Sequence, residues 1–178
     1  MKTYLTYGLG IAGAGFLLNL ILFFTGHHTE LEKVGSAQTI ASVVGLLIAI
    51  AGLGLAIRAR RSEVPVNEDF GYGRALGAGI MTSLVSAIAG AILTFVYMHF
   101  INPGFNDLLV QTEINKWESA GMSQAQIDAA EGIMRKMLHP VAQAAFTVIV
   151  GVIFGTIISL VLAAFIRRRA SLPPPVVA

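Results

Sequence analysis

The chain of 178 residues contains no cysteine, which excludes disulfides, thiolate metal ligands and cysteine nucleophiles. Charge is also scarce. Only 12% of the residues are Asp, Glu, Lys or Arg, whereas about 25% is usual for soluble proteins. Hydrophobic residues make up 55% of the chain. No basic run is long enough to indicate nucleic-acid binding, so we expect no nucleic acid among the partners.

Four stretches carry no charged residue, and the 12 basic and 10 acidic residues lie before, between and after them. Each stretch holds an apolar run of about 20 residues, the length that a helix needs to cross a hydrocarbon layer of about 30 Å. A backbone in lipid must satisfy its own hydrogen bonds, as a helix does. The sequence therefore predicts an all-α membrane protein, a single membrane domain over residues 1–178 embedded in the lipid bilayer. The four transmembrane helices are expected at about 4–25, 37–57, 75–100 and 141–166.

The orientation follows from the distribution of Lys and Arg, which favour the cytoplasmic side. One side carries Lys2, Arg58, Arg60, Arg61, Arg74, Arg167, Arg168 and Arg169. The other side carries Lys33, Lys116, Arg135 and Lys136. This asymmetry predicts that the protein crosses the membrane several times with both termini in the cytoplasm.

The segment 102–139, between the third and fourth spans, is expected to form an external amphipathic helical hairpin. Asn102-Pro103-Gly104 ends the third span, and Ser123-Gln124-Ala125-Gln126 fits a capping box. These signals predict helices at about 106–119 and 124–138. The hairpin would lie on the outer membrane surface or cap the bundle, and its acidic residues favour capping because they disfavour anionic lipid.

Small residues recur at every fourth position in the third and fourth spans, and such rows allow helices to pack closely in lipid. The third span offers Ala78, Thr82, Ser86, Gly90 and Thr94. The fourth offers Thr147, Gly151, Gly155, Ser159 and Ala163. We expect the two rows to face each other within one chain. The alternative is that one row pairs with a second copy of the protein.

Polar groups inside the spans are few, and none is a carboxylate, Lys or Arg, which argues against a proton-coupled carrier. Asn19 is the strongest of them, and it is expected to make an interhelical hydrogen bond; a substrate contact is the alternative. Gly8-Leu9-Gly10-Ile11-Ala12-Gly13 matches G-x-G-x-x-G, but no strand precedes it. Close helix packing is therefore the preferred interpretation of these glycines.

Four histidines, His27, His28, His99 and His139, are expected near the outer surface at the ends of spans. Neutral imidazoles with a carboxylate could bind zinc, but no HExxH or other tight spacing is present. We interpret the histidines as structural, and whether they converge on a metal is left open. No G-x-S-x-G motif supports a hydrolase.

Three segments together resemble a known family. Phe70-Gly71-Tyr72-Gly73-Arg74-Ala75-Leu76-Gly77-Ala78-Gly79 enters the third span, Ile101-Asn102-Pro103 closes it, and Gly121-Met122-Ser123 opens the second outer helix. In these segments the chain resembles the bacterial four-span membrane family known as domain-of-unknown-function family 4199. The resemblance implies a bacterial inner-membrane protein with this helix count, and it implies no activity or binding residue.

The sequence thus favours a non-enzymatic bacterial inner-membrane protein with a structural or interaction role. No catalytic, cofactor-binding or metal-binding residue is predicted. The alternative is a subunit of a small oligomeric transporter or conduit, lined by the hydroxyl side chains of spans three and four. A second copy of the chain or another membrane protein is the expected protein partner.

Overall fold

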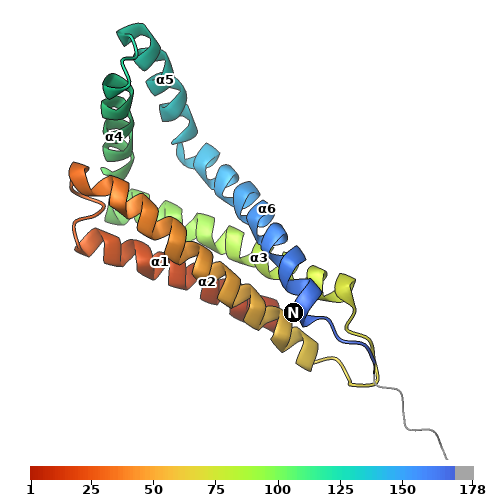
Figure 1. Cartoon of the computed structure of the whole chain (residues 1–178). Coiled ribbons are helices and arrows are strands. Elements are labelled where there is room, and N and C mark those ends of the chain that lie inside the picture. Colours follow the sequence, from red (N-terminus) through yellow and green to blue (C-terminus); the bar gives the residue numbers. More distant parts are fainter. Residues whose placement is uncertain (171–178) are drawn as a thin grey trace, which may run out of the picture.

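A computed structural model of the chain describes residues 1–170, and these residues form a helical protein (Figure 1). The long helices are α1 (Lys2–Phe24), α2 (Val34–Ser62), α3 (Tyr72–Val96) and α6 (Pro140–Ile166). The shorter ones are the 3₁₀ helix η1 (Leu31–Lys33), the π-helix η2 (Tyr97–Ile101), α4 (Phe105–Ser119) and α5 (Gln124–Met137). Over residues 1–170 no strand is formed, apart from an isolated antiparallel bridge between Phe70 and Arg168.

The prediction of an all-α chain with four helices that are apolar and long enough to span a membrane is confirmed. Two of these spans extend through short neighbouring helices, so they run over Leu31–Ser62 and Tyr72–Ile101. Large apolar side chains point outward from all four, among them Leu17, Leu47, Ile92 and Phe165. An apolar outer surface of this kind suits contact with lipid.

Helix α3 is central: it packs against α1, α2 and α6. The α2–α3 loop and the first and last described residues lie at one end of the bundle, here called the terminal end (Figure 1). The opposite end, from which α4 and α5 project, is called the hairpin end. At the terminal end a buried apolar cluster closes the bundle, formed by Ile57, Phe70, Ala75, Ala78, Ala163 and Ile166. Arg168 completes this closure, because its guanidinium donates to the carbonyl groups of Val64 and Pro65, each at 2.8 Å.

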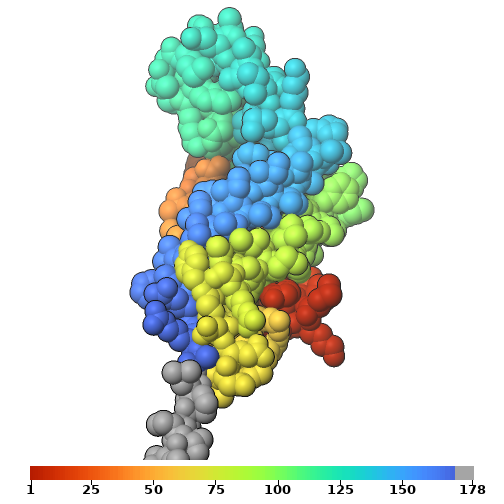
Figure 2. Space-filling view, turned by 90° about the vertical axis from the view of Figure 1, so that its right-hand side faces the viewer, coloured from red at the N-terminus to blue at the C-terminus, as the bar shows by residue number. Residues whose placement is uncertain are grey.

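The most extensive helix contact joins α3 and α6, as the small-residue rows predict, and α6 lies along α3 in Figure 2. The row Gly151–Gly155–Ser159–Ala163 of α6 lies in this interface as expected. On α3 the contact row is one residue further along than predicted, at Gly79, Ser83 and Ala87. A Cβ atom on Gly155 would overlap the side chain of Ser83, one on Gly79 would overlap Ser159, and one on Gly151 would lie 3.0 Å from the Cβ of Ala87.

The segment between α3 and α6 forms a helical hairpin with nearly the predicted bounds. The capping box of Ser123 and Gln126 is present at the start of α5, and Gly121, at φ +76°, reverses the chain between the helices. Capping of the bundle by this hairpin is not what the structure shows. Near its start α4 packs against η1 and α2, and the rest of the hairpin projects away from the bundle (Figures 1 and 2).

We predict that Gly155→Ala destabilises the protein, because the new methyl group would push α3 and α6 apart at Ser83. The expected loss is about 1–3 kcal/mol of unfolding free energy, the usual cost of overpacking. Gly77→Ala on α3 is the matched control, since a methyl group added there would meet no atom within 4 Å and alanine favours helix. Unfolding in a denaturing-detergent titration measures both, and equal stability of the two variants would contradict this packing.

Candidate functional site at the hairpin end

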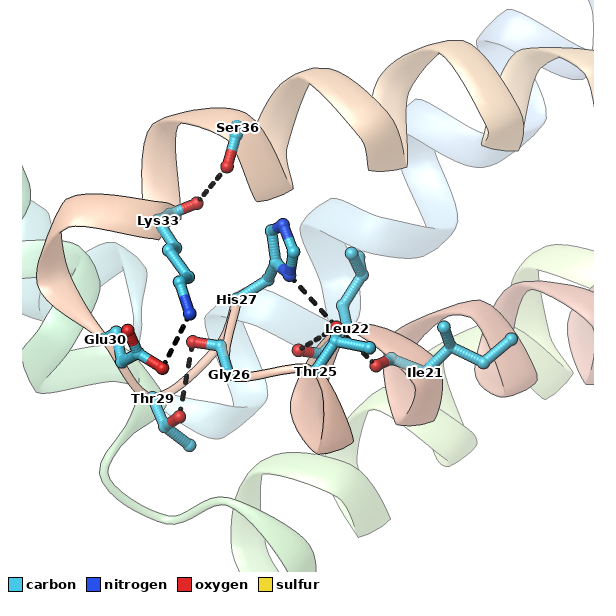
Figure 3. Close-up of polar contacts among 9 residues, drawn as sticks. All are labelled: Ile21, Leu22, Thr25, Gly26, His27, Thr29, Glu30, Lys33 and Ser36. Atoms are coloured by element: carbon cyan, nitrogen blue, oxygen red, sulfur yellow. Dashed lines mark hydrogen bonds and ion pairs between the residues drawn. The ribbon is translucent and has the colours of Figure 1, made fainter.

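A tight turn follows α1 (Figure 3), and it leads to a buried histidine, His28. Gly26 adopts φ +81°, a conformation that side chains rarely allow, and it lets the chain reverse at once. The Thr25 hydroxyl donates to the carbonyl of Ile21 at 2.8 Å and lies 3.0 Å from His27 Nδ1. Lys33 pairs with Glu30 at 2.8 Å on the other arm of the turn. The turn therefore holds His27 near the surface and directs the next residue inward.

The third span ends in a π-helix, η2, which brings Tyr97 to face the same turn. The N–H of Asn102 donates to the carbonyl of Tyr97 at 2.8 Å, closing the wider five-residue turn. Pro103 follows and cannot donate a further helical hydrogen bond. Tyr97 is 2% exposed, so this turn places a phenol inside the bundle.

His28, Tyr97 and Asn102 form a buried hydrogen-bonded network. His28 Nδ1 lies 2.7 Å from the Tyr97 hydroxyl, and Asn102 Nδ2 donates to the His28 carbonyl at 2.9 Å and to the Tyr97 hydroxyl at 3.3 Å. The ring of Phe105, the first residue of α4, lies 4.2 Å from the His28 ring. The network thus joins the α1–α2 turn, the end of the third span and the base of the hairpin.

The environment of His28 disfavours its protonation. Burial lowers the pKa of His28 from 6.5 to about 4, and the neighbouring His27 contributes in the same direction. At neutral pH the ring is therefore neutral and can exchange a hydrogen bond with the Tyr97 hydroxyl.

The other histidines have different surroundings. His99 is exposed and stacks on Phe95, with ring centres 5.4 Å apart, and His139 is an exposed residue preceding α6. Among residues 1–170, no three His, Asp or Glu side chains are grouped so that they could hold a metal ion. The structure therefore does not bring the four histidines to one point.

The hydroxyl groups of spans three and four fall into two sets. Thr82, Ser83, Thr156 and Ser159 donate to carbonyl oxygens four residues earlier in their own helices, at 2.6–2.9 Å. This satisfies the hydroxyls within their own helices. Ser86, Thr94 and Thr147 make no hydrogen bond within residues 1–170 and line a cavity of about 280 Å³ among α1, α2, α3 and α6.

Asn19 lies on the same cavity, here called the mid-bundle groove. The expected interhelical hydrogen bond is not formed, since the Asn19 amide has no hydrogen-bond partner in the described part of the chain. A neighbouring cavity of about 190 Å³ shares Ser86, Ala87 and Gly151 with the groove and reaches Leu53. Towards the terminal end lies the buried cluster that closes the bundle.

The glycine motif in α1 serves packing at one of its positions. A Cβ on Gly8 would lie 2.6 Å from Val85 of α3, whereas no atom lies within 4 Å of the corresponding positions on Gly10 and Gly13. This agrees with the packing interpretation of the motif. Sequence reasoning missed the network around Tyr97, because no sequence signal marks a π-helix, although the Asn102-Pro103 break was a pointer to an irregular helix end.

These features define a class of protein: a helical protein with four membrane-spanning-type helices and a polar network at one end. A family model described as protein of unknown function (DUF4199) matches residues 6–168, so the chain belongs to that family. The resemblance noted in the sequence is thereby confirmed. No curated protein and no solved structure matches the chain.

We predict that the free energy of unfolding falls as the pH is lowered from about 6.5 to about 4. Unfolded His28 takes up a proton near its ordinary pKa of 6.5, whereas folded His28 resists until about 4. The unfolded state therefore binds more protons in this window, and the loss should be roughly 3 kcal/mol at most.

His28→Gln should flatten this part of the stability profile, and His99→Gln, which changes an exposed ring, should leave the profile as it is. Detergent-denaturation curves at a series of pH values measure the effect. Parallel profiles for the wild type and His28→Gln would contradict the assignment.

Proposed function

We propose that the protein is a non-enzymatic, multi-pass inner-membrane protein whose α4–α5 hairpin contacts a partner outside the membrane. The observation that carries this proposal is the projection of the hairpin away from the bundle (Figure 1). Two helices with this little support from the rest of the chain expose most of their surface. Such a surface suits recognition of another protein.

The hairpin is held as one unit. Arg135 of α5 pairs with Asp107 of α4 at 2.9 Å and with Glu131 of its own helix at 2.7 Å. At its base, Phe105 is buried beside the His28 network. Both contacts lie at the base of the hairpin, near the start of α4 and the end of α5, and a hairpin held at its base can present its outer surface without a large ordering cost on binding.

The second helix of the hairpin carries an apolar row on its outside. Ile133 is 61% exposed and Met137 is 54% exposed, and the two are four residues apart on one face of α5. Methionine and aliphatic side chains exposed in this way favour protein contacts over solvent. Another membrane protein, or a second copy of this chain, is the proposed partner.

A cysteine in this cysteine-free chain tests both the placement and the contact. We expect Ser119→Cys, near the tip of the hairpin, to react from outside intact spheroplasts with an impermeant photo-crosslinker and to capture a partner. Ser62→Cys changes a residue at the terminal end that is also exposed, and it should not react. Adding Ile133→Ser and Met137→Ser should reduce the adduct by about tenfold, as for loss of a central contact.

The matched control for that experiment is the pair Gln111→Ser and Asn115→Ser, which alters exposed residues of α4. If Ser62→Cys reacted and Ser119→Cys did not, the protein would have the opposite orientation in the membrane. If the adduct persisted without Ile133 and Met137, these residues of α5 would not make the contact.

A second candidate function is a subunit of a conduit or transporter, and the mid-bundle groove is the observation that favours it. Asn19, Ser86, Thr94 and Thr147 line it without hydrogen-bond partners in residues 1–170. Unpaired polar groups in a membrane interior are costly, so a polar occupant would stabilise them. The buried cluster at the terminal end would then act as the closed gate of such a path.

Whether water reaches the mid-bundle groove tests this second candidate function. In a conduit, Ser86→Cys on the groove should react with a water-soluble thiol reagent at least tenfold faster than Thr82→Cys, about the ratio expected between a wetted and a packed thiol. Thr82 is fully buried, one turn away on the same helix. Equal and negligible reaction at both positions would exclude an aqueous path.

A further inference from the structure

A separate cavity lies at the hairpin end, between the end of the third span, the start of α4 and the start of α6. Its volume is about 190 Å³. Its polar lining comes from Thr94, His99, Asn106 and Gln143, and the remaining wall is made of alanine, proline, Phe95 and Met98. We call it the hairpin-end pocket. It meets the mid-bundle groove at Thr94, which lines both.

The polar groups of this pocket are short of partners. Asn106 Nδ2 donates to the Leu138 carbonyl at 3.4 Å, which directs the amide nitrogen to α5 because a carbonyl can only accept. Asn106 Oδ1 also lacks a partner in residues 1–170, but it is fully buried, so an occupant of the pocket does not reach it. The side chains of Thr94 and Gln143 also make no hydrogen bond there. Buried polar atoms are normally paired, so this arrangement favours a ligand with both donors and acceptors.

The ligand should be uncharged. No Asp, Glu, Lys or Arg lines the pocket, and the ring of its one histidine, His99, is stacked on Phe95. An ion would therefore lose its hydration without meeting a fixed counter-charge. The Gln143 amide offers both a carbonyl oxygen, which accepts from a hydroxyl group, and N–H donors. Phe95 and Met98 supply an apolar wall beside it.

The size and position of the pocket select a head group rather than a whole molecule. An apolar cavity of about 150 Å³ accommodates benzene, whereas sites for drug-sized ligands start near 300 Å³. Residues 91–99 belong to a span, and the wall at Phe95 is 43% exposed on the apolar outer surface. A membrane-dissolved molecule could therefore place a small head here and lay its tail along the groove beyond Thr94.

We propose that the hairpin-end pocket binds the neutral, hydroxyl-bearing head of a membrane-dissolved amphiphile. The head donates a hydroxyl to the amide oxygen of Gln143, and the amide nitrogen of Gln143 and the hydroxyl of Thr94 donate to its other oxygens. Two membrane components share this chemistry, the glycerol head of a diacylglycerol and the ring of a quinol. The inference does not depend on the hairpin contact proposed above.

Equilibrium binding to the full chain in phosphatidylcholine nanodiscs tests the site. The probes are radiolabelled dioctanoylglycerol and a short-chain benzoquinol, each in competition with anionic dioctanoyl phosphatidic acid. We expect one neutral probe to saturate at one molecule per chain without displacement by phosphatidic acid, and the probe that binds identifies the source. Gln143→Leu should weaken this binding about tenfold, as for the loss of one hydrogen bond between the ligand and the protein.

Gln111→Leu is the matched control, because Gln111 is an exposed glutamine of α4 that does not line the pocket and is bonded to Asn115 at 3.0 Å. It should bind the neutral probe like the wild type. The proposal is overturned if neither neutral probe saturates, if phosphatidic acid displaces the bound probe, or if folded Gln143→Leu binds as tightly as the wild type. Should Gln143→Leu fail to fold by size-exclusion chromatography, the competition between neutral and anionic probes on the wild type decides.

Discussion

The close approach of α3 and α6 is the contact on which the other features of this protein depend. Lipid tails offer no hydrophobic drive for helices to associate, so dispersion between backbones that approach closely must supply it. At Gly79–Ser159 and Gly155–Ser83 the two helices leave no room for a further methyl group. The hydroxyls of both serines return to carbonyl oxygens of their own helices, so the contact contains no unpaired polar group.

That contact also explains where the cavities lie. The buried cluster of Ile57, Phe70, Ala78 and Ala163 closes the terminal end, while α6 diverges from α1 and α2 towards the hairpin (Figure 1). The space left by this divergence holds the mid-bundle groove. The hydroxyls divide accordingly: those in the tight half are satisfied by their helices, and Ser86, Thr94 and Thr147 in the open half are not. The tight contact at the terminal end and the unpaired hydroxyls of the groove therefore both follow from the way α6 packs on α3.

The sequence predicts the spans well because the hydrocarbon layer of the bilayer excludes charged residues and has a nearly fixed thickness, so each span needs an uncharged run of a known length. The contact face of α3 is predicted less well, since Ala78–Thr82–Ser86 and Gly79–Ser83–Ala87 are both rows of small residues. They differ by one residue, and only the position of α1 and α6 distinguishes them. The prediction of a hydrogen bond for Asn19 fails because the spacing of residues along one helix does not say how far away the next helix lies.

The π-helix at the end of the third span gives one short segment two tasks. It turns Tyr97 inward to His28 and Asn102, which fixes the base of the hairpin, and the next two residues, Met98 and His99, line the hairpin-end pocket. Because these residues are adjacent, the position of the hairpin and one wall of the pocket are set by the same turn.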